Sequence, residues 1–394
     1  MQLREHAVSS AESAKAFFHI PDDVTYLNCA NMAPQLRSVT EAGMEAMHAQ
    51  QAPWALAPAQ WFSGAERLRT LAARVLGTEA DGVALVPAVS YGIAIAAANL
   101  PVSSGQKIIL LDQEFPSNVY AWRELASRKR ARVIHVRRHS GTSWTDALEE
   151  AIDRKTAIVA IPQCHWMDGS KIDLERVGKR VRTVGAGLVI DASQSLGAQR
   201  LDLNRVQPDF LVAVGYKWLL GPYGLGYLYA APQWRESGTP LEQSWLARSG
   251  SEDFSALATY TDEYRPGARR FDMGEFPQFL LIPMAVAALQ QILNWGVARV
   301  ADSLAPLTNW LAGSASEDGL SVLPPDQRST HMIGMRYPNQ MPSGLIDQLK
   351  EQKIFVSIRG DSIRVAPHLY NDIPDLEKLF AILQRLHSGR RENK

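Results

Sequence analysis

Cysteine is scarce in this chain of 394 residues, which contains only Cys29 and Cys164. Two cysteines without metal-type spacing exclude a disulfide scaffold and a zinc ribbon, and they are typical of a reducing compartment. An excess of charge is also absent, because 41 basic and 41 acidic residues give a formal net charge of zero. The basic footprint of a nucleic-acid-binding protein is therefore missing.

Hydrophobic runs long enough to cross a membrane are missing as well. The longest uncharged stretch, residues 83–105, is interrupted by prolines and polar residues, which indicates a strand, a loop and a helix rather than a membrane span. The N-terminal residues mix charges with apolar residues and contain no signal-peptide core. We therefore expect a cytoplasmic protein that binds neither membranes nor nucleic acids.

The glycine fingerprint G-x-G-x-x-G of dinucleotide-binding folds is absent too. The glycine-rich stretch GPYGLG, residues 221–226, leads into a strand and not into a helix, so it is no substitute. This absence counts against a nicotinamide-dependent oxidoreductase on a doubly wound sheet.

Short runs of aliphatic, β-branched and aromatic residues recur along the first 260 residues or so, separated by helical patterns. Such continuous apolar runs are typical of strands buried on both faces of a mostly parallel sheet. Asp173 is well placed to be the N-cap of one covering helix. The sequence therefore predicts an α/β domain of about seven strands, at residues 83–87, 107–112, 132–136, 157–162, 187–191, 210–214 and 226–230.

A polar crossing that contains proline and glycine, residues 262–283, ends this pattern. An apolar helix, short strands and a last helix follow, and Leu376, Leu379, Phe380 and Leu383 share one face of that last helix. These elements predict a smaller α+β domain. The expected division is an N-terminal segment at 1–21, a large domain at 22–262 and a small C-terminal domain at 263–394.

Ligands of open α/β sheets gather at the carboxyl ends of the strands, and two charged residues lie there. Asp191 ends one apolar strand, where it is either a helix N-cap or a counter-ion for a cationic ring nitrogen. Lys217 follows the next strand, and its amine either reaches water or is a desolvated nucleophile able to form a Schiff base. Gln194 could contact the same ligand as Asp191, and Tyr216 adds a hydroxyl beside the lysine.

A helix N-terminus and an aromatic ring follow two other strands. The turn at Val89 and Ser90 offers backbone N–H groups and a hydroxyl, which suit either a phosphate or an ordinary N-cap. Phe115, next to Pro116, is either a core residue or a plate that stacks on a flat cofactor.

Three more residues complete the candidate set. His165 and Trp166 end a further strand, where either ring could contact a ligand or belong to the core. Arg364 lies inside an apolar strand of the small domain, and its planar guanidinium suits a carboxylate, either of a substrate or of an internal salt bridge. Together the candidates are the parts that a pyridoxal phosphate (PLP) enzyme needs, because PLP is held through a lysine Schiff base and an acidic partner.

The stretch VIDASQS followed by VGYKWLLGPYGLGYLY resembles the class V aminotransferase family of PLP-dependent enzymes, which includes cysteine desulfurases, isopenicillin-N epimerases and kynureninase. The likeness extends over residues 26–371. It implies the fold-type I architecture, with a seven-stranded, mostly parallel large domain and a small α+β C-terminal domain. It also implies a homodimer with active sites at its interface.

The same resemblance implies roles for the cofactor-binding residues. Lys217 would form the Schiff base, and Asp191 would pair with the pyridinium nitrogen. Gln194 would lie near the phenolic oxygen, and Phe115 would stack on the ring. The phosphate would be held by Val89, Ser90 and Tyr216.

Other roles follow from the same likeness. Many members bond the phenolic oxygen with an asparagine, for which Trp166 or His165 would substitute here. Arg364 would bind the α-carboxylate of an amino-acid substrate, and Asn31 would line the substrate pocket.

The resemblance leaves the reaction open. Lys217 would move protons at the substrate α-carbon in amino transfer, in epimerisation and in C–S or C–C bond cleavage alike. Amino transfer is the first expectation, and an epimerase or a lyase is the alternative. A cysteine desulfurase is disfavoured, because the family's nucleophilic cysteine lies on a C-terminal loop and no cysteine follows Cys164.

Overall fold

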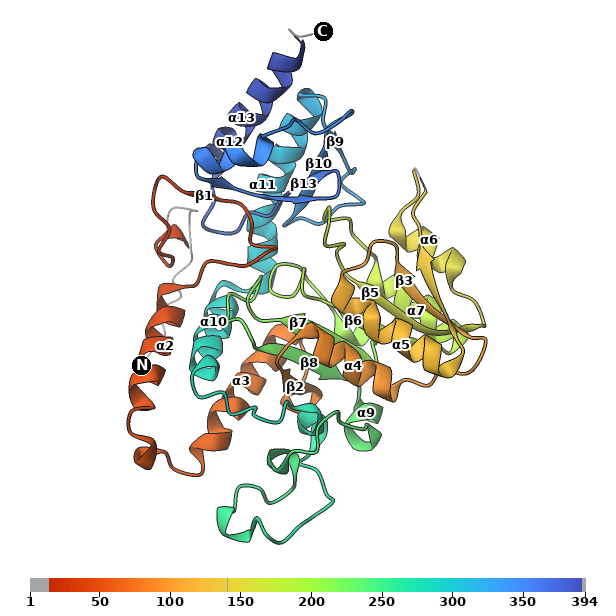
Figure 1. The fold of residues 1–394 in the computed structure, drawn as a ribbon, viewed down its shortest axis with the longest axis vertical. Coiled ribbons are helices and arrows are strands. Elements are labelled where there is room, and N and C mark those ends of the chain that lie inside the picture. The colour runs from red at the N-terminus through yellow and green to blue at the C-terminus, as the bar shows by residue number, and fades with distance from the viewer. Residues whose placement is uncertain (1–13, 140, 392–394) are drawn as a thin grey trace.

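The computed structural model describes residues 14–139 and 141–391, so most of the expected N-terminal segment 1–21 lies outside the described residues. All seven predicted strands of the large domain are present in one sheet, with the order β2-β8-β7-β6-β5-β3-β4 (Figure 1). Their bounds are β2 Val83–Val86, β3 Lys107–Leu111, β4 Arg132–Val136, β5 Thr156–Pro162, β6 Gly187–Asp191, β7 Phe210–Val214 and β8 Gly226–Ala230.

The sheet is mixed but mostly parallel, as the sequence predicts. Strands β3, β4, β5, β6 and β7 are parallel to one another, whereas β8 is antiparallel to both β2 and β7. The direction of β8 is not visible in the sequence, because an apolar run has the same pattern in either direction. A short loop after β7 can therefore return directly into β8, and this loop contains Lys217.

Helices cover both faces of the sheet, because alternate strand residues pack into two separate hydrophobic clusters. Asp173 caps the helix that follows it, as predicted, by accepting hydrogen bonds from the N–H groups of Glu175 and Arg176, both at 3.1 Å. One face carries α4 (Val89–Asn99) and α5 (Tyr120–Lys129). The other carries α3 (Gln60–Leu76), α6 (Trp144–Ala151) and α7 (Leu174–Val184).

A buried ion pair fastens α3 to the edge of this sheet. Arg69 is completely buried, and its Nη2 lies 2.7 Å from Asp272 Oδ2. Asp272 Oδ1 also accepts the backbone N–H of Leu85 in β2, at 2.7 Å. The carboxylate of Asp272, in the crossing between the domains, is therefore linked to both helix α3 and strand β2.

The C-terminal part forms a second, four-stranded antiparallel sheet with the order β12-β13-β10-β9. Helix α13 packs on it through Leu376, Leu379, Phe380 and Leu383, which are all buried, as the helical pattern predicts. The elements are α11 Val297–Glu317, β9 Ser321–Val322, β10 Ile333–Arg336, α12 Leu345–Glu351, β11 Ile354–Phe355, β12 Ser357–Arg359, β13 Ser362–Val365 and α13 Ile373–Arg391.

The start of the described chain packs with this C-terminal part and not with the large sheet. Strand β1 (Thr25–Tyr26) pairs in parallel with β11, and Phe18, Leu27 and Leu36 belong to the same hydrophobic cluster as α13. This packing differs from the expected division at residue 22, because a pairing so distant in sequence leaves no local pattern. Helix α2 (Arg37–Ala49) then leads to α3.

Helix α10 (Leu281–Trp295) connects the two packing units. Ile282 and Leu289 lie in the cluster of the large sheet, whereas Ile292 and Trp295 lie in the cluster of the small one. None of the described helices is by itself long and apolar enough to span a membrane. Helices α10 and α11 reach the required length and composition only together, and they are bent by 73° at their junction.

Candidate active site

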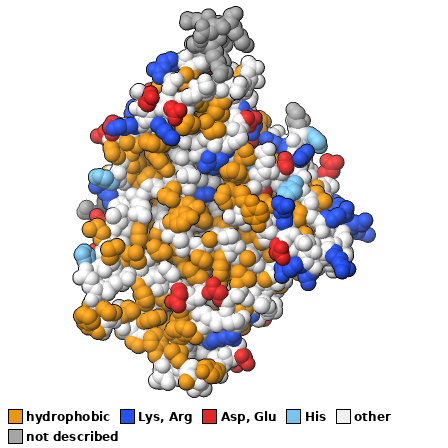
Figure 2. All heavy atoms as spheres, in the orientation of Figure 1, with side chains coloured by type: hydrophobic (Ala, Val, Ile, Leu, Met, Phe, Trp, Pro, Cys, Tyr) orange, Lys and Arg blue, Asp and Glu red, His pale blue; other side chains and the backbone are white. Residues whose placement is uncertain are grey.

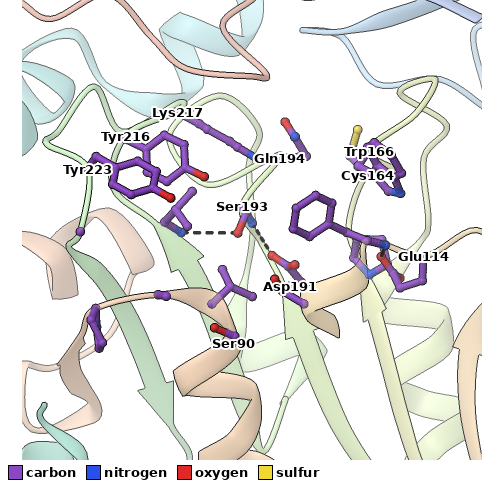
Figure 3. Close-up of a pocket in the computed structure, with 18 residues that line it drawn as sticks. Ser90, Glu114, Cys164, Trp166, Asp191, Ser193, Gln194, Tyr216, Lys217 and Tyr223 are labelled. Atoms are coloured by element: carbon purple, nitrogen blue, oxygen red, sulfur yellow. Dashed lines mark hydrogen bonds between the residues drawn. The ribbon is translucent and has the colours of Figure 1, made fainter. Parts of the chain in front are cut away.

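A cavity of about 260 Å³ lies at the carboxyl ends of β5, β6 and β7 (Figure 3). Three groups of predicted residues meet there. They are the residues at the N-terminus of α4, the aromatic residues, and the charged residues at the ends of β6 and β7. The predicted residues that line it are Val89, Ser90, Phe115, Trp166, Asp191, Gln194, Tyr216 and Lys217.

Lys217 reaches the cavity from the tight loop between β7 and β8. The loop closes through a hydrogen bond from Gly221 N–H to Gly215 C=O at 2.8 Å, and a Cβ on Gly215 would lie 2.8 Å from the carbonyl oxygen of Leu225. The Lys217 amine stands 5.5 Å from the ring of Phe115. Burial lowers the pKa of Lys217 to about 8, although Asp191 opposes this shift, so more of the amine is unprotonated and nucleophilic at neutral pH than in an exposed lysine.

Asp191 faces the cavity from the end of β6 (Figure 3). The next helix, α8 (Leu203–Val206), begins well after it, so the N-cap alternative does not hold. Its Oδ1 accepts the N–H of Ser193 at 2.9 Å. Burial raises the pKa of Asp191, and the positive charge of Lys217 opposes the shift.

Another part of the cavity wall is built from the N-terminus of α4. Its cap residue, Ala88, provides no side-chain hydrogen bond, so the first backbone N–H groups of the helix remain for a ligand. Ser90 lies in this part of the wall in Figure 3. The rings of Tyr216 and Tyr223 lie 4.6 Å apart on the same side, and Tyr223 is a lining residue that the sequence did not point to.

The aromatic wall consists of Phe115 and Trp166, whose rings meet edge to face at 5.5 Å. The indole N–H of Trp166 donates to the carbonyl of Gln113 at 2.8 Å. Because this donor already has a backbone partner, the structure does not fit the expected role of Trp166 as a donor to a cofactor oxygen.

His165 is the predicted cofactor-binding residue that the cavity does not include. Its ring stacks on Trp144 at 5.5 Å and lines a neighbouring cavity with Asp168 and Arg336. Trp166 lies in the turn that follows β5 and its ring lines the cavity, whereas the ring of His165 packs on Trp144. The predicted cofactor role of His165 therefore does not fit its position.

Gln194 lines the cavity, but both ends of its amide have protein partners. Its Nε2 donates to the carbonyl of Ala30 at 2.9 Å, and its Oε1 accepts the indole N–H of Trp218 at 3.1 Å. The amide is therefore held in one orientation, with its face toward the cavity.

Arg364 and Asn31 do not line the cavity, but they lie just behind its wall. Arg364 donates from Nη1 to the carbonyl of Trp166 at 2.7 Å. Asn31 Oδ1 accepts a 3.4 Å hydrogen bond from Arg359, a residue that the sequence reading missed.

Glu114 is a second carboxyl group in the cavity wall, and it was also missed. Its Oε1 accepts the N–H of Phe115 at 2.7 Å, while Oε2 is buried and has no partner among the described residues. Burial raises the pKa of Glu114 to about 8, and Asp191 adds to the shift. The sequence could have indicated Glu114, because it directly precedes Phe115 after the end of a strand.

Residues 25–370 match the sequence model of the family described as "Aminotransferase class-V". The chain belongs to this family. A relative with the printed name "Uncharacterized aminotransferase YcbU", from Bacillus subtilis, is 27% identical over 300 residues, which are 76% of this chain and 77% of that protein. The chain is thus a class V aminotransferase-family enzyme, and its reaction type is not fixed by this membership.

Solved structures of this fold extend the likeness to nearly the whole chain. The apo structure of a cysteine desulfurase from Thermococcus onnurineus superposes with a TM-score of 0.83 at 19% identity, over 97% of this chain and 99% of that one. A structure of a C-DES mutant, with glycine covalently linked to its PLP cofactor, gives a TM-score of 0.82 at 19% identity, over 93% and 97%. At this identity the likeness shows the fold, which is that of fold type I.

Proposed function

We propose that this protein is a PLP-dependent enzyme that acts at the α-carbon of an amino-acid substrate, and that it is an aminotransferase. The observation that carries the proposal is the arrangement of Lys217 and Asp191, which face one cavity from the ends of neighbouring strands, with the Phe115 ring 5.5 Å from the amine. Family membership and the PLP-containing relative support the proposal.

The cavity fits the chemical features of PLP one by one. The uncapped N-terminus of α4 and the Ser90 hydroxyl suit the phosphate. The Asp191 carboxyl group, which lines the cavity at the end of β6, suits the ring N–H. Phe115 offers an aromatic face for the cofactor ring. The amine of Lys217, beside that face, suits the aldehyde group of PLP. Bound PLP supplies an electron sink for the pair of electrons released at the substrate α-carbon.

The residues of the chain would then divide the remaining work. Asp191 would hold the proton on the ring nitrogen, and Tyr216 would add a hydroxyl to the phosphate end. Lys217 Nζ, once displaced by the substrate amine, would take the α-proton as general base, because its lowered pKa lies close to neutral pH. Arg364 would bind the α-carboxylate through its guanidinium fork.

Persulfide transfer from a protein cysteine is not part of this proposal. The thiols of Cys29 and Cys164 are both buried, and burial raises the pKa of Cys164 to about 12. A thiol that stays protonated is a poor nucleophile, which supports amino transfer over desulfuration by this route.

We also propose that the enzyme is a cytoplasmic homodimer. Large apolar side chains stand exposed at the start of the chain, notably Met44, Met47 and Trp54, whose exposed fractions are 59%, 61% and 84%. Figure 2 shows hydrophobic side chains over the face that carries α2. Such a patch is typical of a protein–protein contact. The two free thiols suit a reducing compartment.

The cofactor assignment is tested by adding PLP to the purified protein. We expect the yellow absorbance of a lysine-bound PLP, and borohydride reduction should place the label on the peptide that contains Lys217. Lys217→Ala should remove both signals, whereas the exposed control Lys155→Ala should keep them. A protein that stays colourless, or a label on another lysine, would overturn the proposal.

The reaction type is tested with amino acids in heavy water. Amino transfer predicts an oxo acid and the pyridoxamine form of the cofactor. Deuterium at an inverted α-carbon would indicate an epimerase, and loss of a side-chain group with release of ammonia would indicate a lyase; either result would replace the aminotransferase assignment.

A further inference from the structure

Two arginines lie on one face of the small antiparallel sheet, close to the cavity. In the pairing of β12 with β13, Ser357 lies opposite Arg364 and Arg359 lies opposite Ser362. Directly paired residues share a face, and residues two apart on a strand share it as well. Arg359 and Arg364 are therefore diagonal neighbours on the same face.

Neither guanidinium has an acidic partner within 4 Å among the described residues. Arg364 is almost fully buried and donates to the neutral oxygens of Trp166 and Ser357, at 2.7 and 3.4 Å, and its Nε has no partner. Arg359 donates to the carbonyl of Ile358 at 2.8 Å and to Asn31 at 3.4 Å.

The buried Arg69, Arg235 and Arg265 each have an acidic partner, whereas Arg364 shares the lack of one with Arg328 among the described residues. Arg69 is equally buried, and it forms two hydrogen bonds with Asp272. A buried charge without an opposite charge is costly. Burial together with the nearby charge of Arg359 lowers the pKa of Arg364 to about 9, so the pair has an excess of positive charge that a ligand can neutralise.

Trp166 links both arginines to the cavity. Its carbonyl accepts from Arg364, and its ring stands 5.9 Å from the guanidinium of Arg359. The same ring lines the cavity against Phe115. Arg364 is the more deeply buried of the two and donates to the backbone of the cavity-lining Trp166, so we assign it to the α-carboxylate.

We propose that Arg359 binds a second anionic group, so that the substrate is an amino acid with an acidic side chain. The inference rests on the proposed function and makes it more specific. With its amine at Lys217 and its α-carboxylate at Arg364, such a substrate would extend its side-chain carboxylate to Arg359. Arg359 then determines specificity and takes no part in the proton transfer at the α-carbon.

The first experiment uses the protein without PLP and measures its melting temperature. Glutarate, which has two carboxylates, should raise the melting temperature more than butyrate, which has one. In Arg359→Leu the two compounds should act alike, and in the exposed control Arg299→Leu the difference should persist. Equal effects of glutarate and butyrate on the unchanged protein would contradict the proposal.

The second experiment compares kcat/KM for glutamate and aspartate with the values for glutamine and asparagine, which have the same shapes without the charge. The acids should be preferred, and Arg359→Leu should lower kcat/KM about 10- to 100-fold for the acids only, as expected for a lost hydrogen bond to a charged group. Arg359→Lys, which keeps the charge without the fork, should retain part of the preference.

The outcomes separate the two proposals. If PLP does not label Lys217, the proposed function fails. If Lys217 is labelled but acids and amides react equally well, or if Arg359→Leu lowers kcat/KM equally for all substrates, only the role of Arg359 is overturned. Thermal unfolding of each variant identifies a loss of folding, and in that case Arg359→Lys decides the question.

Discussion

The indole N–H of Trp218 donates to Gln194 Oε1 at 3.1 Å, and this bond holds the amide at the cavity wall. Trp218 is 1% exposed and lies one residue after Lys217. The loop that carries the lysine amine thus also fixes Gln194, a polar residue of the cavity wall.

Replacing Trp218 by phenylalanine should weaken both cofactor binding and stability. The change leaves a buried amide oxygen without a donor, which costs about 1–3 kcal/mol of unfolding free energy. Urea unfolding and titration with PLP measure the two effects. Trp310→Phe in the small domain is the matched control, and an equal rise of the PLP Kd in that variant would contradict a specific role for the Trp218 bond.

Asp191→Asn should lower kcat/KM by about 10²-fold or more, because a neutral amide stabilises the ring proton poorly. The stability of the PLP-free protein at neutral pH should not fall, since burial already disfavours the charged carboxylate. Steady-state kinetics and urea unfolding test the two statements. A variant with normal kcat/KM, or a normal absorbance spectrum with PLP, would argue against the pairing. The exposed Asp253→Asn serves as the control.

Glu114→Gln should change how stability depends on pH. The carboxyl has a pKa of about 8 in the folded protein against an ordinary value of 4.5, so the folded state binds more protons than the unfolded state in this range. The contribution of Glu114 to stability should therefore be fully present below pH 4.5, fall as the pH rises toward 8, and level off above it.

In Glu114→Gln this part of the decline should be absent, because the amide does not ionise. Unfolding free energies measured across the pH range, without PLP, give the comparison. The exposed Glu351→Gln should keep the slope of the unchanged protein. Parallel curves for the unchanged protein and Glu114→Gln would show that Glu114 is not buried in its neutral form.

Asp272→Ala should destabilise the protein by about 3–5 kcal/mol, because it leaves the buried guanidinium of Arg69 without its counter-ion. The double variant Arg69→Met with Asp272→Leu should lose much less, since no charge is left unpaired. Urea denaturation gives both values. Equal losses in the single and double variants would show that the packing of these side chains matters more than their charges.

The sequence located the strands well because they are buried on both faces and therefore appear as continuous apolar runs. It also located the cavity, since Asp191, Lys217, Ser90 and Phe115 follow strands whose ends meet at one edge. Side-chain direction was harder to predict. His165 and Trp166 follow the same strand, and only the packing of His165 on Trp144 shows that it turns away.

Glu114 and Arg359 were missed for a related physical reason. Both are charged residues in or beside turns, where an exposed side chain is the ordinary expectation. Their proximity to the cavity arises from tertiary packing between segments that have no common local pattern. The pairing of β1 with β11 was invisible for the same reason.

The pairing of β1 with β11 has a consequence for the order in which parts of the protein fold during synthesis. Asn31 and Arg359 are 328 residues apart, and β1 finds its partner only in Ile354–Phe355. A nascent chain that ends before these strands has the whole large sheet, with Lys217 and Asp191 already translated, but not the wall that would select the substrate. Because domains tend to fold as they emerge, the chain can place Lys217 in its loop before it acquires the residues that we propose discriminate among amino acids.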